Sequence, residues 1–548
     1  MYPELAPCVE SFIRQNTAAA YLRRRNDAMY INGVTLRDIS KHVERTLNLT
    51  VSPDTIHRLM KPRRQGTITS KLFKSVIDAR VPAKRNSGEK KIHEDFHYTS
   101  AQVGLLNEMA TYCSQNTIRL SVDNKNKVEV GTPAVNRRSQ IRTFHLIPDA
   151  PNYCDHDFPH RNSKLTPAGY QVLKAKQTRS RSLSPPRIRN SNRRRRCLSE
   201  NDGYTSHATV KNRKCEIIKD KIGREKIKWA RSGPLTVRIN PSRIIGSTNI
   251  MHMNFLGKFL HRQALNVYNV IAIADGGPDW SVKGVLNLLS MGYLWKNLML
   301  DILIIQCYAP GHSRFNAIER LWAILTKWLI GVILPIDILG EVPDENSDEW
   351  LKVLDQAASL CAKFWDGKFH DGFKVSAQTF LSTDPLLEDL KKSHSMLNEF
   401  VYASAKKIKE TPHLLNLQND YKFFVRHCNR KAYQIEFIRC HEDSCTHCST
   451  LPKRENEFLD LINEFGGSCP EPEKSLLFPG HYATFLDQLR ILKTGHGKAK
   501  KKTSSECPSA IFGRCKLGCS YIFFSDCDRK RHNRLMGHPT QRKRVIEK

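Results

Sequence analysis

Two stretches decide the fold of this chain: IADGGPDW at residues 273–280 and YAPGHSRFNAIERLWAIL at residues 308–325. The first begins inside an apolar run, 269–274, that ends on Asp275, and the two glycines and the proline after it predict a turn. This pattern predicts a buried strand with a carboxylate exposed at its end, which is a common place for metal-binding acids.

The second stretch predicts a turn at Pro310 and a helix capped by Ser313. Glu319 lies on this helix, and no lysine or arginine stands three or four residues away to neutralise it. A divalent cation shared with Asp275 would stabilise this carboxylate. The apolar positions of the predicted helix repeat at helical spacing: Phe315, Ile318, Leu321, Trp322, Leu325 and Leu329.

These acids and their surroundings resemble the second and third acids of DDE transposases of the mariner type. The third motif of that family has a proline-containing turn, then Asn, one residue, Ile-Glu, and a Trp three positions later. Asn316, Ile318, Glu319 and Trp322 occupy those places. The resemblance implies an α/β catalytic core, an RNase H-like mixed sheet flanked by helices. It also implies DNA as partner and a homo-oligomer when active, because two element ends must be held together.

The first acid of the triad is expected at Asp123, where residues 119–123 predict a strand followed by a polar turn and a return strand up to residue 131. Such a hairpin opens an RNase H-like fold. The competing acids lie in a loop rich in proline and histidine, without a strand leading into them: Asp149, Asp155 and Asp157. Asp279 remains an additional or alternative ligand to Asp275.

Four further elements of the core are expected: a strand over 233–239, a helix over 251–260, a helix over 282–289 and a strand over 302–307. His252, on the first of these helices, is expected to pack in the core. Asp275 and Glu319 are 44 residues apart, which leaves room for an insertion around 293–300.

Three carboxylates can hold two divalent ions that stabilise the attacking and leaving oxygens of a phosphodiester. Oxygen ligands favour Mg²⁺ or Mn²⁺, so catalysis and metal binding are assigned to Asp123, Asp275 and Glu319. Cys307 and His312, which lie near these acids in the sequence, are expected to pack or to contact substrate rather than bind metal.

The charge of the chain supports a nucleic-acid partner independently. With 87 Lys and Arg against 54 Asp and Glu, the formal net charge is +33, which suits a phosphate backbone rather than a small-molecule substrate. No stretch is long and apolar enough to predict a membrane span. The 16 cysteines gather toward the C-terminus at metal-ligand spacings, which indicates zinc in a reducing compartment.

A helix-turn-helix domain is expected at 30–85, with one amphipathic helix after Thr35 and a second capped by Ser52. The side chains expected to contact DNA are Thr55, His57, Arg58, Lys61, Arg63 and Arg64. Two short helices with this turn also occur in proteins that never touch DNA, and the neighbouring transposase-like core favours the DNA-binding interpretation.

The catalytic domain is expected at 110–340, interrupted by a disordered basic insertion at 174–214 that holds the run RRRR at 193–196. That insertion is interpreted as a nuclear localisation signal, with a non-specific DNA clamp or a solvated insertion as alternatives. The protein is therefore expected in the nucleus. A helical region at 341–415 follows.

Two zinc sites are expected beyond residue 420. A cluster in 420–475 offers Cys440, Cys445 and Cys448, completed by either His427 or Cys428. The region 505–548 resembles a two-cysteine, two-histidine zinc finger with a basic tail. Its ligands would be Cys515, Cys519, His532 and His538, with Phe523 at the aromatic core position and Arg529 where that family has leucine.

Two functions remain open from the sequence. The first is an active, element-derived DDE transposase that performs metal-dependent cleavage and strand transfer. The second is a domesticated, catalytically inactive nuclear DNA-binding protein that retains the fold. Intact acids favour the first, and inverted terminal repeats in the DNA flanking the gene would discriminate between them.

Overall fold

The computed structural model describes residues 3–16, 36–60, 76–77, 93–125, 127–130, 164–174, 215–241, 247–263, 267–329, 332, 334–335, 343–344, 346–494, 511–519 and 521–538. Several sequence predictions fall outside these residues: Lys61, Arg63, Arg64, Asp149, Asp155, Asp157 and the basic insertion after Lys174. The chain divides into two units, Met1–His93 and Glu94–Lys548.

The first unit is built from α1 (Leu5–Asn16), α2 (Leu36–Leu47) and α3 (Pro53–Met60). Ile39 and Val43 of α2 and Ile56 of α3 are buried in one small core. Ser52 begins α3 as expected, because its Oγ accepts a hydrogen bond from the Thr55 amide at 3.1 Å. The turn before it includes Asn48 at φ 49°, a left-handed conformation that asparagine tolerates.

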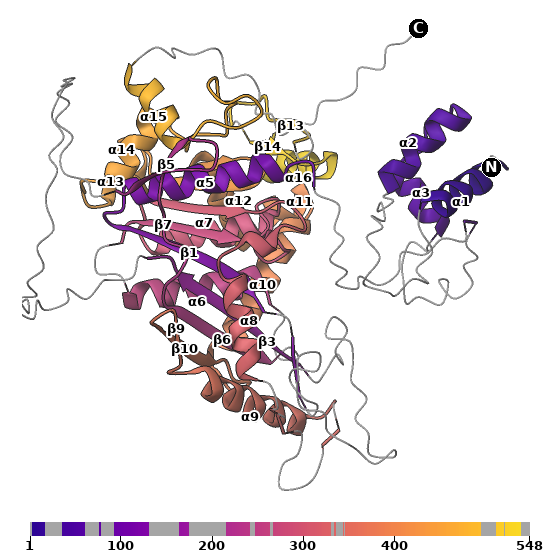
Figure 1. The fold of residues 1–548 in the computed structure, drawn as a ribbon. Coiled ribbons are helices and arrows are strands. Elements are labelled where there is room, and N and C mark those ends of the chain that lie inside the picture. Colours follow the sequence, from indigo (N-terminus) through magenta and orange to yellow (C-terminus); the bar gives the residue numbers. More distant parts are fainter. Residues whose placement is uncertain are drawn as a thin grey trace, which may run out of the picture. The chain divides into compact units, whose positions relative to one another are not determined.

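The second unit is an α/β structure around one ten-stranded mixed sheet, which confirms the expected fold class at that level (Figure 1). The strand order is β11-β12-β8-β7-β1-β3-β6-β10-β9, and β2 pairs with β3. β1, β7 and β8 run parallel to one another, while β3 is antiparallel to both β1 and β6. The strands of this sheet are β1 (Thr117–Asn124), β2 (Val128–Glu129), β3 (Lys164–Val172), β6 (Leu235–Pro241), β7 (Asn269–Ala274), β8 (Ile302–Cys307), β9 (Phe369–His370), β10 (Phe373–Thr379), β11 (Cys428–Arg430) and β12 (Gln434–Ile438).

Helices cover both faces of the sheet because its central strands are apolar on both sides. Along β7, Ile271 and Ile273 pack into one core with α5 (Phe96–Tyr112), α14 (Glu457–Glu464) and α15 (Phe485–Thr494). Val270 and Ala272 point to the other core, formed with α6 (Asn249–Gln263), α7 (Val285–Asn297), α10 (Leu386–Tyr402) and α12 (Pro412–Arg426). A third core joins β6 to α8 (Glu319–Trp328) and α9 (Asp348–Trp365).

The remaining elements are small: β4 (Ile217–Lys219), β5 (Glu225–Ile227), η2 (Ser313–Phe315), α11 (Ala405–Glu410), α13 (Thr446–Thr450), β13 (Gly513–Arg514), β14 (Ile522–Phe523) and α16 (Asp526–Met536). Within the residues that the structure describes, no helix is both long and apolar enough to cross a membrane.

The strands predicted at 233–239, 269–274 and 302–307 are present as β6, β7 and β8, and α6 contains the predicted helix at 251–260. The hairpin predicted after Asp123 is wrong. The strand antiparallel to β1 is β3, which begins at Lys164, and the short β2 pairs with β3 instead. A short strand cannot offer β1 the ladder that the nine residues of β3 provide.

Three other expectations also need correction. No insertion interrupts 293–300, because α7 continues to Asn297. The helix of the second motif does not begin at Ser313. A short 3-10 turn, η2, comes first, the backbone is extended at Asn316, and α8 begins at Glu319. The region 341–415 is not purely helical, since it supplies β9 and β10, and β10 pairs in parallel with β6.

Candidate acidic site and cysteine-histidine clusters

Asp123 and Asp275 stand at the same edge of the sheet. β1 and β7 are adjacent and parallel, and their pairing ends with Ser121 opposite Ile273. Two residues further along each strand, the chain reaches Asp123 and Asp275. Because the carboxyl ends of parallel strands share one edge, the topology brings these two acids together although they are distant in sequence.

Glu319 is brought to this edge by Asn316. The Asn316 side-chain amide donates to the carbonyl of Val122 at 3.0 Å, and its oxygen accepts from Ser121 Oγ at 2.5 Å. The same Ser121 Oγ accepts from the amide of Ile318 at 3.0 Å. These contacts fasten the start of α8 to β1, one residue before Asp123. Glu319 is the first residue of α8, where the helix dipole favours a negative charge.

The three acids interact electrostatically. Burial raises the pKa of Asp123 well above its ordinary value, and the negative charges of Asp275 and Glu319 raise it further. Trp322 Nε1 donates to Asp123 Oδ2 at 3.2 Å and opposes this shift. A buried carboxylate beside two others is therefore destabilised in its charged form, which a bound cation would reverse.

Lys125 adds a positive charge to the same region. Burial lowers its pKa to about 8, and the charge of Glu319 acts in the opposite direction. The lysine was not singled out from the sequence, because it lies in a turn where basic residues are ordinary. Its burial and its electrostatic contact with Glu319 appear only in the folded chain.

Gly169 makes room for the tryptophan beside Asp123. It lies opposite Asp123 in the β1–β3 pairing. A Cβ added there would be 2.5 Å from Trp322 Cη2 and 2.7 Å from Ile318 Cδ1. The indole therefore lies directly over the backbone of β3, and glycine is required at this position. No sequence pattern indicated this role for Gly169.

Asp279, the alternative metal ligand to Asp275, takes part in polar contacts with neighbouring side chains. Its Oδ2 accepts from Asn124 Nδ2 at 3.0 Å and lies 3.7 Å from His252 Nε2. His252 is buried and its Nδ1 lies 2.6 Å from the hydroxyl of Tyr170. Asp279 thus joins a polar network behind the acidic edge, and His252 packs as expected.

Cys307 and His312 are packing residues in this structure. The Cys307 thiol donates to the carbonyl of Trp280 at 3.3 Å, and burial raises its pKa to about 12. The His312 ring is buried and stacks on Phe96, with ring centroids 4.3 Å apart.

Helix α3 of the N-terminal unit presents polar side chains to solvent. Thr55, His57 and Arg58 are exposed on α3, while Ile56 and Met60 are buried on its opposite side. This is the division of faces that a helix needs if it contacts another molecule through its polar side.

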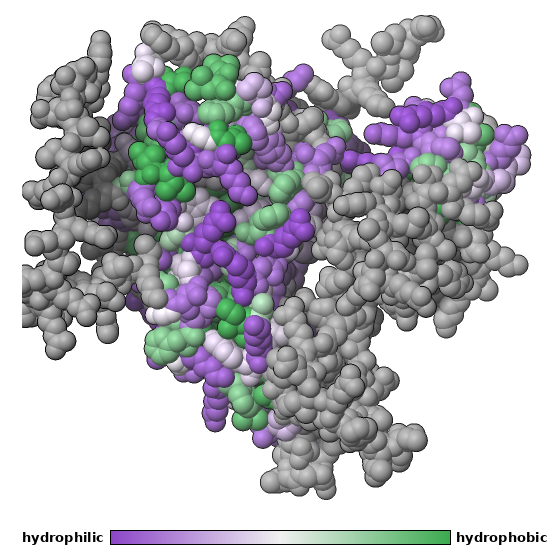
Figure 2. Space-filling model, in the orientation of Figure 1, coloured by the Kyte–Doolittle hydropathy of each residue, from purple (hydrophilic) through white to green (hydrophobic). Residues whose placement is uncertain are grey.

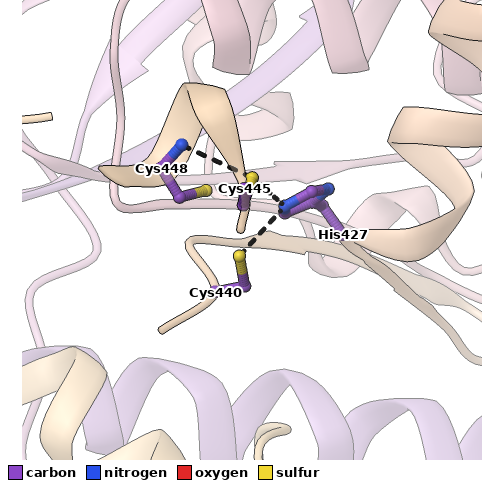
Figure 3. Close-up of side chains that lie close together, drawn as sticks. All are labelled: His427, Cys440, Cys445 and Cys448. Atoms are coloured by element: carbon purple, nitrogen blue, oxygen red, sulfur yellow. Dashed lines mark hydrogen bonds between the residues drawn. The ribbon is translucent and has the colours of Figure 1, made fainter. Parts of the chain in front are cut away.

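The first cysteine-histidine cluster consists of His427, Cys440, Cys445 and Cys448 (Figure 3). Their ligand atoms all lie within 4.8 Å of one another, and the group could hold a metal ion. His427 Nδ1 donates to the carbonyl of Phe423 at 2.9 Å, so the ring directs Nε2 toward Cys440 Sγ, at 3.3 Å, and Cys445 Sγ, at 3.4 Å. This hydrogen bond fixes the ring orientation that metal ligation requires.

The choice between His427 and Cys428 is thereby resolved in favour of the histidine. Cys428 is the first residue of β11 and packs against the main hydrophobic core. Burial raises its pKa to about 12, as for an inert thiol.

The second cluster consists of Cys515, Cys519, His532 and His538, and its ligand atoms also lie within 4.8 Å of one another. His532 Nε2 lies 3.2 Å from Cys519 Sγ, and His538 Nε2 lies 3.8 Å from the same sulfur. Burial lowers the pKa of His532 to about 3, so the ring is neutral and its nitrogen can donate to a metal. Phe523 is buried at the expected core position.

Among the described residues, these two clusters are the groups of three or more ligands gathered within 4.8 Å. Asp123, Asp275 and Glu319 are not among these groups. Comparison of the chain with models of protein families, with curated proteins and with solved structures finds no match.

Proposed function

We propose that this chain is a DDE-type transposase that cleaves and joins DNA through an acidic site formed by Asp123, Asp275 and Glu319. The observation that carries the proposal is the meeting of these acids: two at the ends of adjacent parallel strands, the third at the start of a helix fastened to one of them. The electrostatic coupling of Asp123 to the other two supports it.

The sheet supports the finer assignment of an RNase H-like core. Its middle order, β6-β3-β1-β7-β8, places an antiparallel strand on one side of β1 and two parallel strands on the other. In such a core the first acid lies on the central strand, the second ends its parallel neighbour, and the third lies on a later helix. The positions of Asp123 on β1, Asp275 after β7 and Glu319 at the start of α8 support the proposed arrangement.

The donor set fits Mg²⁺ or Mn²⁺, since all three side chains offer carboxylate oxygens. When bound, such ions stabilise the attacking and leaving oxygens of the phosphodiester. The chain's own contribution is positioning. Asn316 and Ser121 hold the start of α8, and the Trp322 indole orients one oxygen of Asp123.

Charge and surface favour DNA as the substrate. The net charge of +33 supplies the phosphate contacts, and exposed Thr55, His57 and Arg58 on α3 fit a recognition helix. Figure 2 shows hydrophilic side chains interspersed with hydrophobic ones on the visible face of the described residues. We also propose zinc at both cysteine-histidine clusters, because sulfur and imidazole ligands in sets of four are typical of structural zinc sites.

The test uses the full chain and supercoiled DNA that carries the sequences flanking the gene on both sides. Nicking with Mn²⁺ or Mg²⁺ is expected for the wild type and is expected to be lost in Glu319→Gln, while DNA affinity stays within twofold. Asp279→Asn is the matched control, since it removes a nearby acid of the structural network; it should retain cleavage.

Equal loss in Asp279→Asn and Glu319→Gln would refute the assignment of Glu319 as a specific ligand. DNA binding without any metal-dependent nicking by the wild type would instead support a domesticated DNA-binding protein that retains the acids.

A further inference from the structure

The C-terminal module (511–538) shares its hydrophobic interior with the main core. Tyr521, Phe523 and Leu535 are buried in the same cluster as Tyr421 and Phe424 of α12. Figure 1 shows α16 beside α12, which agrees with the contacts between the two helices. The apolar side of the module is therefore covered by a helix of the main unit.

Polar contacts fix the same interface. His532, one of the four cluster residues, is fully buried, and its Nδ1 lies 3.1 Å from the hydroxyl of Tyr421. Gln418 Nε2 donates to the carbonyl of Leu535 at 2.9 Å, and Arg534 donates to the carbonyl of Val401 at 2.5 Å. Hydrogen-bond donors on both sides thus pair with acceptors across the interface, as expected for a specific intramolecular interface.

Asp528 is the decisive residue. Zinc fingers that read DNA place base contacts just before the helix and at its third and sixth positions. Asp528 is the third residue of α16. Here its carboxylate forms a salt bridge with Arg430 Nη1 at 3.1 Å, with only 7% and 1% of the two side chains exposed. A base could reach this position only if a buried ion pair were broken, which is strongly unfavourable.

Arg430 carries the contact onward to the loop that follows Asp275. Its Nε donates to the carbonyl of Val282 at 3.1 Å, and its Nη2 donates to the carbonyl of Lys283 at 2.5 Å. Its Nη1 also donates to the carbonyl of Ile522 in the module at 3.1 Å. One buried guanidinium therefore joins the module, strand β11 and the segment between the acidic edge and α7.

We propose that the C-terminal module is a zinc-dependent clasp that holds the loop 276–284 through Asp528 and Arg430, and that it does not read DNA. The third position of α16, one of those that DNA-reading fingers use, is occupied within the chain by the ion pair of Asp528 and Arg430. Zinc, by ordering α16, keeps Asp528 in place, and Arg430 is a positioning residue for the loop. The clasp does not depend on whether the acids cut DNA.

The test is hydrogen-deuterium exchange of the full chain with zinc, without Mg²⁺ or Mn²⁺. Asp528→Asn should speed amide exchange in 276–288 at least tenfold while the zinc content stays that of the wild type. Asp526→Asn is the matched control. Asp526 lies on the same helix, and within the described part of the chain its ion pairs are with Arg529 and Lys530 of that helix, so exchange in the loop should not change.

A second variant covers the case in which Asp528→Asn does not fold. Cys519→Ser should release one zinc and speed exchange in both α16 and 276–288, while α9, which packs with β6 in a separate core, keeps wild-type exchange. Equal exchange in the loop for wild type, Asp528→Asn and Cys519→Ser would overturn the clasp. So would protection of α16 by added DNA in the wild type, because it would show that the helix face is open to bases.

Discussion

Replacing Gly169 by alanine tests the packing around Asp123 most directly. The new Cβ would lie 2.5 and 2.7 Å from two atoms of the Trp322 ring and 2.7 Å from Ile318 Cδ1. Trp322 and Ile318 are 6% and 0% exposed, so neither side chain can move aside freely. Overpacking of this kind costs about 1–3 kcal/mol. Displacing the indole also removes its hydrogen bond to the Asp123 carboxylate, which contributes about 1.5–3 kcal/mol.

Gly169→Ala should therefore destabilise the second unit by about 2.5–6 kcal/mol, a large share of the roughly 5–15 kcal/mol typical of a domain. Thermal unfolding by fluorescence should show a melting temperature lower by several degrees and a smaller stabilisation by added Mn²⁺. The control is Gly104→Ala in the middle of α5, where no atom lies within 4 Å of an added Cβ. Alanine there should be neutral or stabilise by up to ~1 kcal/mol. Wild-type melting of Gly169→Ala, or equal losses in both variants, would refute this account of the packing.

Three further outcomes are expected. Burial raises the pKa of Glu108 from 4.5 to about 7. Between these two pH values, the Glu108 carboxyl is protonated in the folded chain and ionised in the unfolded chain. Stability should fall as the pH rises through this window, by at most about 3 kcal/mol, and melting temperatures of Glu108→Gln should lack this component. Cys445→Ser should halve the zinc content measured by mass spectrometry, whereas Cys428→Ser should leave it unchanged. Arg58→Ala should weaken DNA binding by the full chain. If Arg58 contacts a phosphate, the affinity should depend less steeply on salt, and if it contacts a base, discrimination between DNA sites should fall. Unchanged affinity and unchanged discrimination would place the DNA contact elsewhere.

The parts of the fold that were predictable are those with a local signal. The apolar runs at 269–274 and 302–307 are continuous because both faces of their strands are covered, and each ends at a turn. Asn316 and Trp322 were selected through a family resemblance. Their roles follow from contacts to residues on β1, about two hundred positions earlier in the chain.

The mistaken hairpin shows where local reasoning stops. A polar turn after Asp123 and two strand-like residues look like a return strand, but β1 pairs with β3, which begins only at Lys164. The sequence between residues 125 and 164 does not indicate which distant segment forms the longer run of backbone hydrogen bonds with β1. The need for glycine at 169 is equally non-local, since it comes from the Trp322 ring.

The C-terminal module shows how a departure from a family pattern can carry structural information. Arg529 stands where an independent zinc finger has a core leucine, and in this structure it pairs with Asp526 at 2.5 Å, with 42% of its side chain exposed. The module does not need that leucine, because α12 supplies Tyr421, whose ring and hydroxyl lie against His532. A small module that borrows its core from a neighbour can lose an internal apolar residue without losing its fold, provided that the neighbour stays in place. The missing leucine is therefore better explained by docking than by decay of the module, and the buried pair of Asp528 and Arg430 is the contact that keeps the neighbour there.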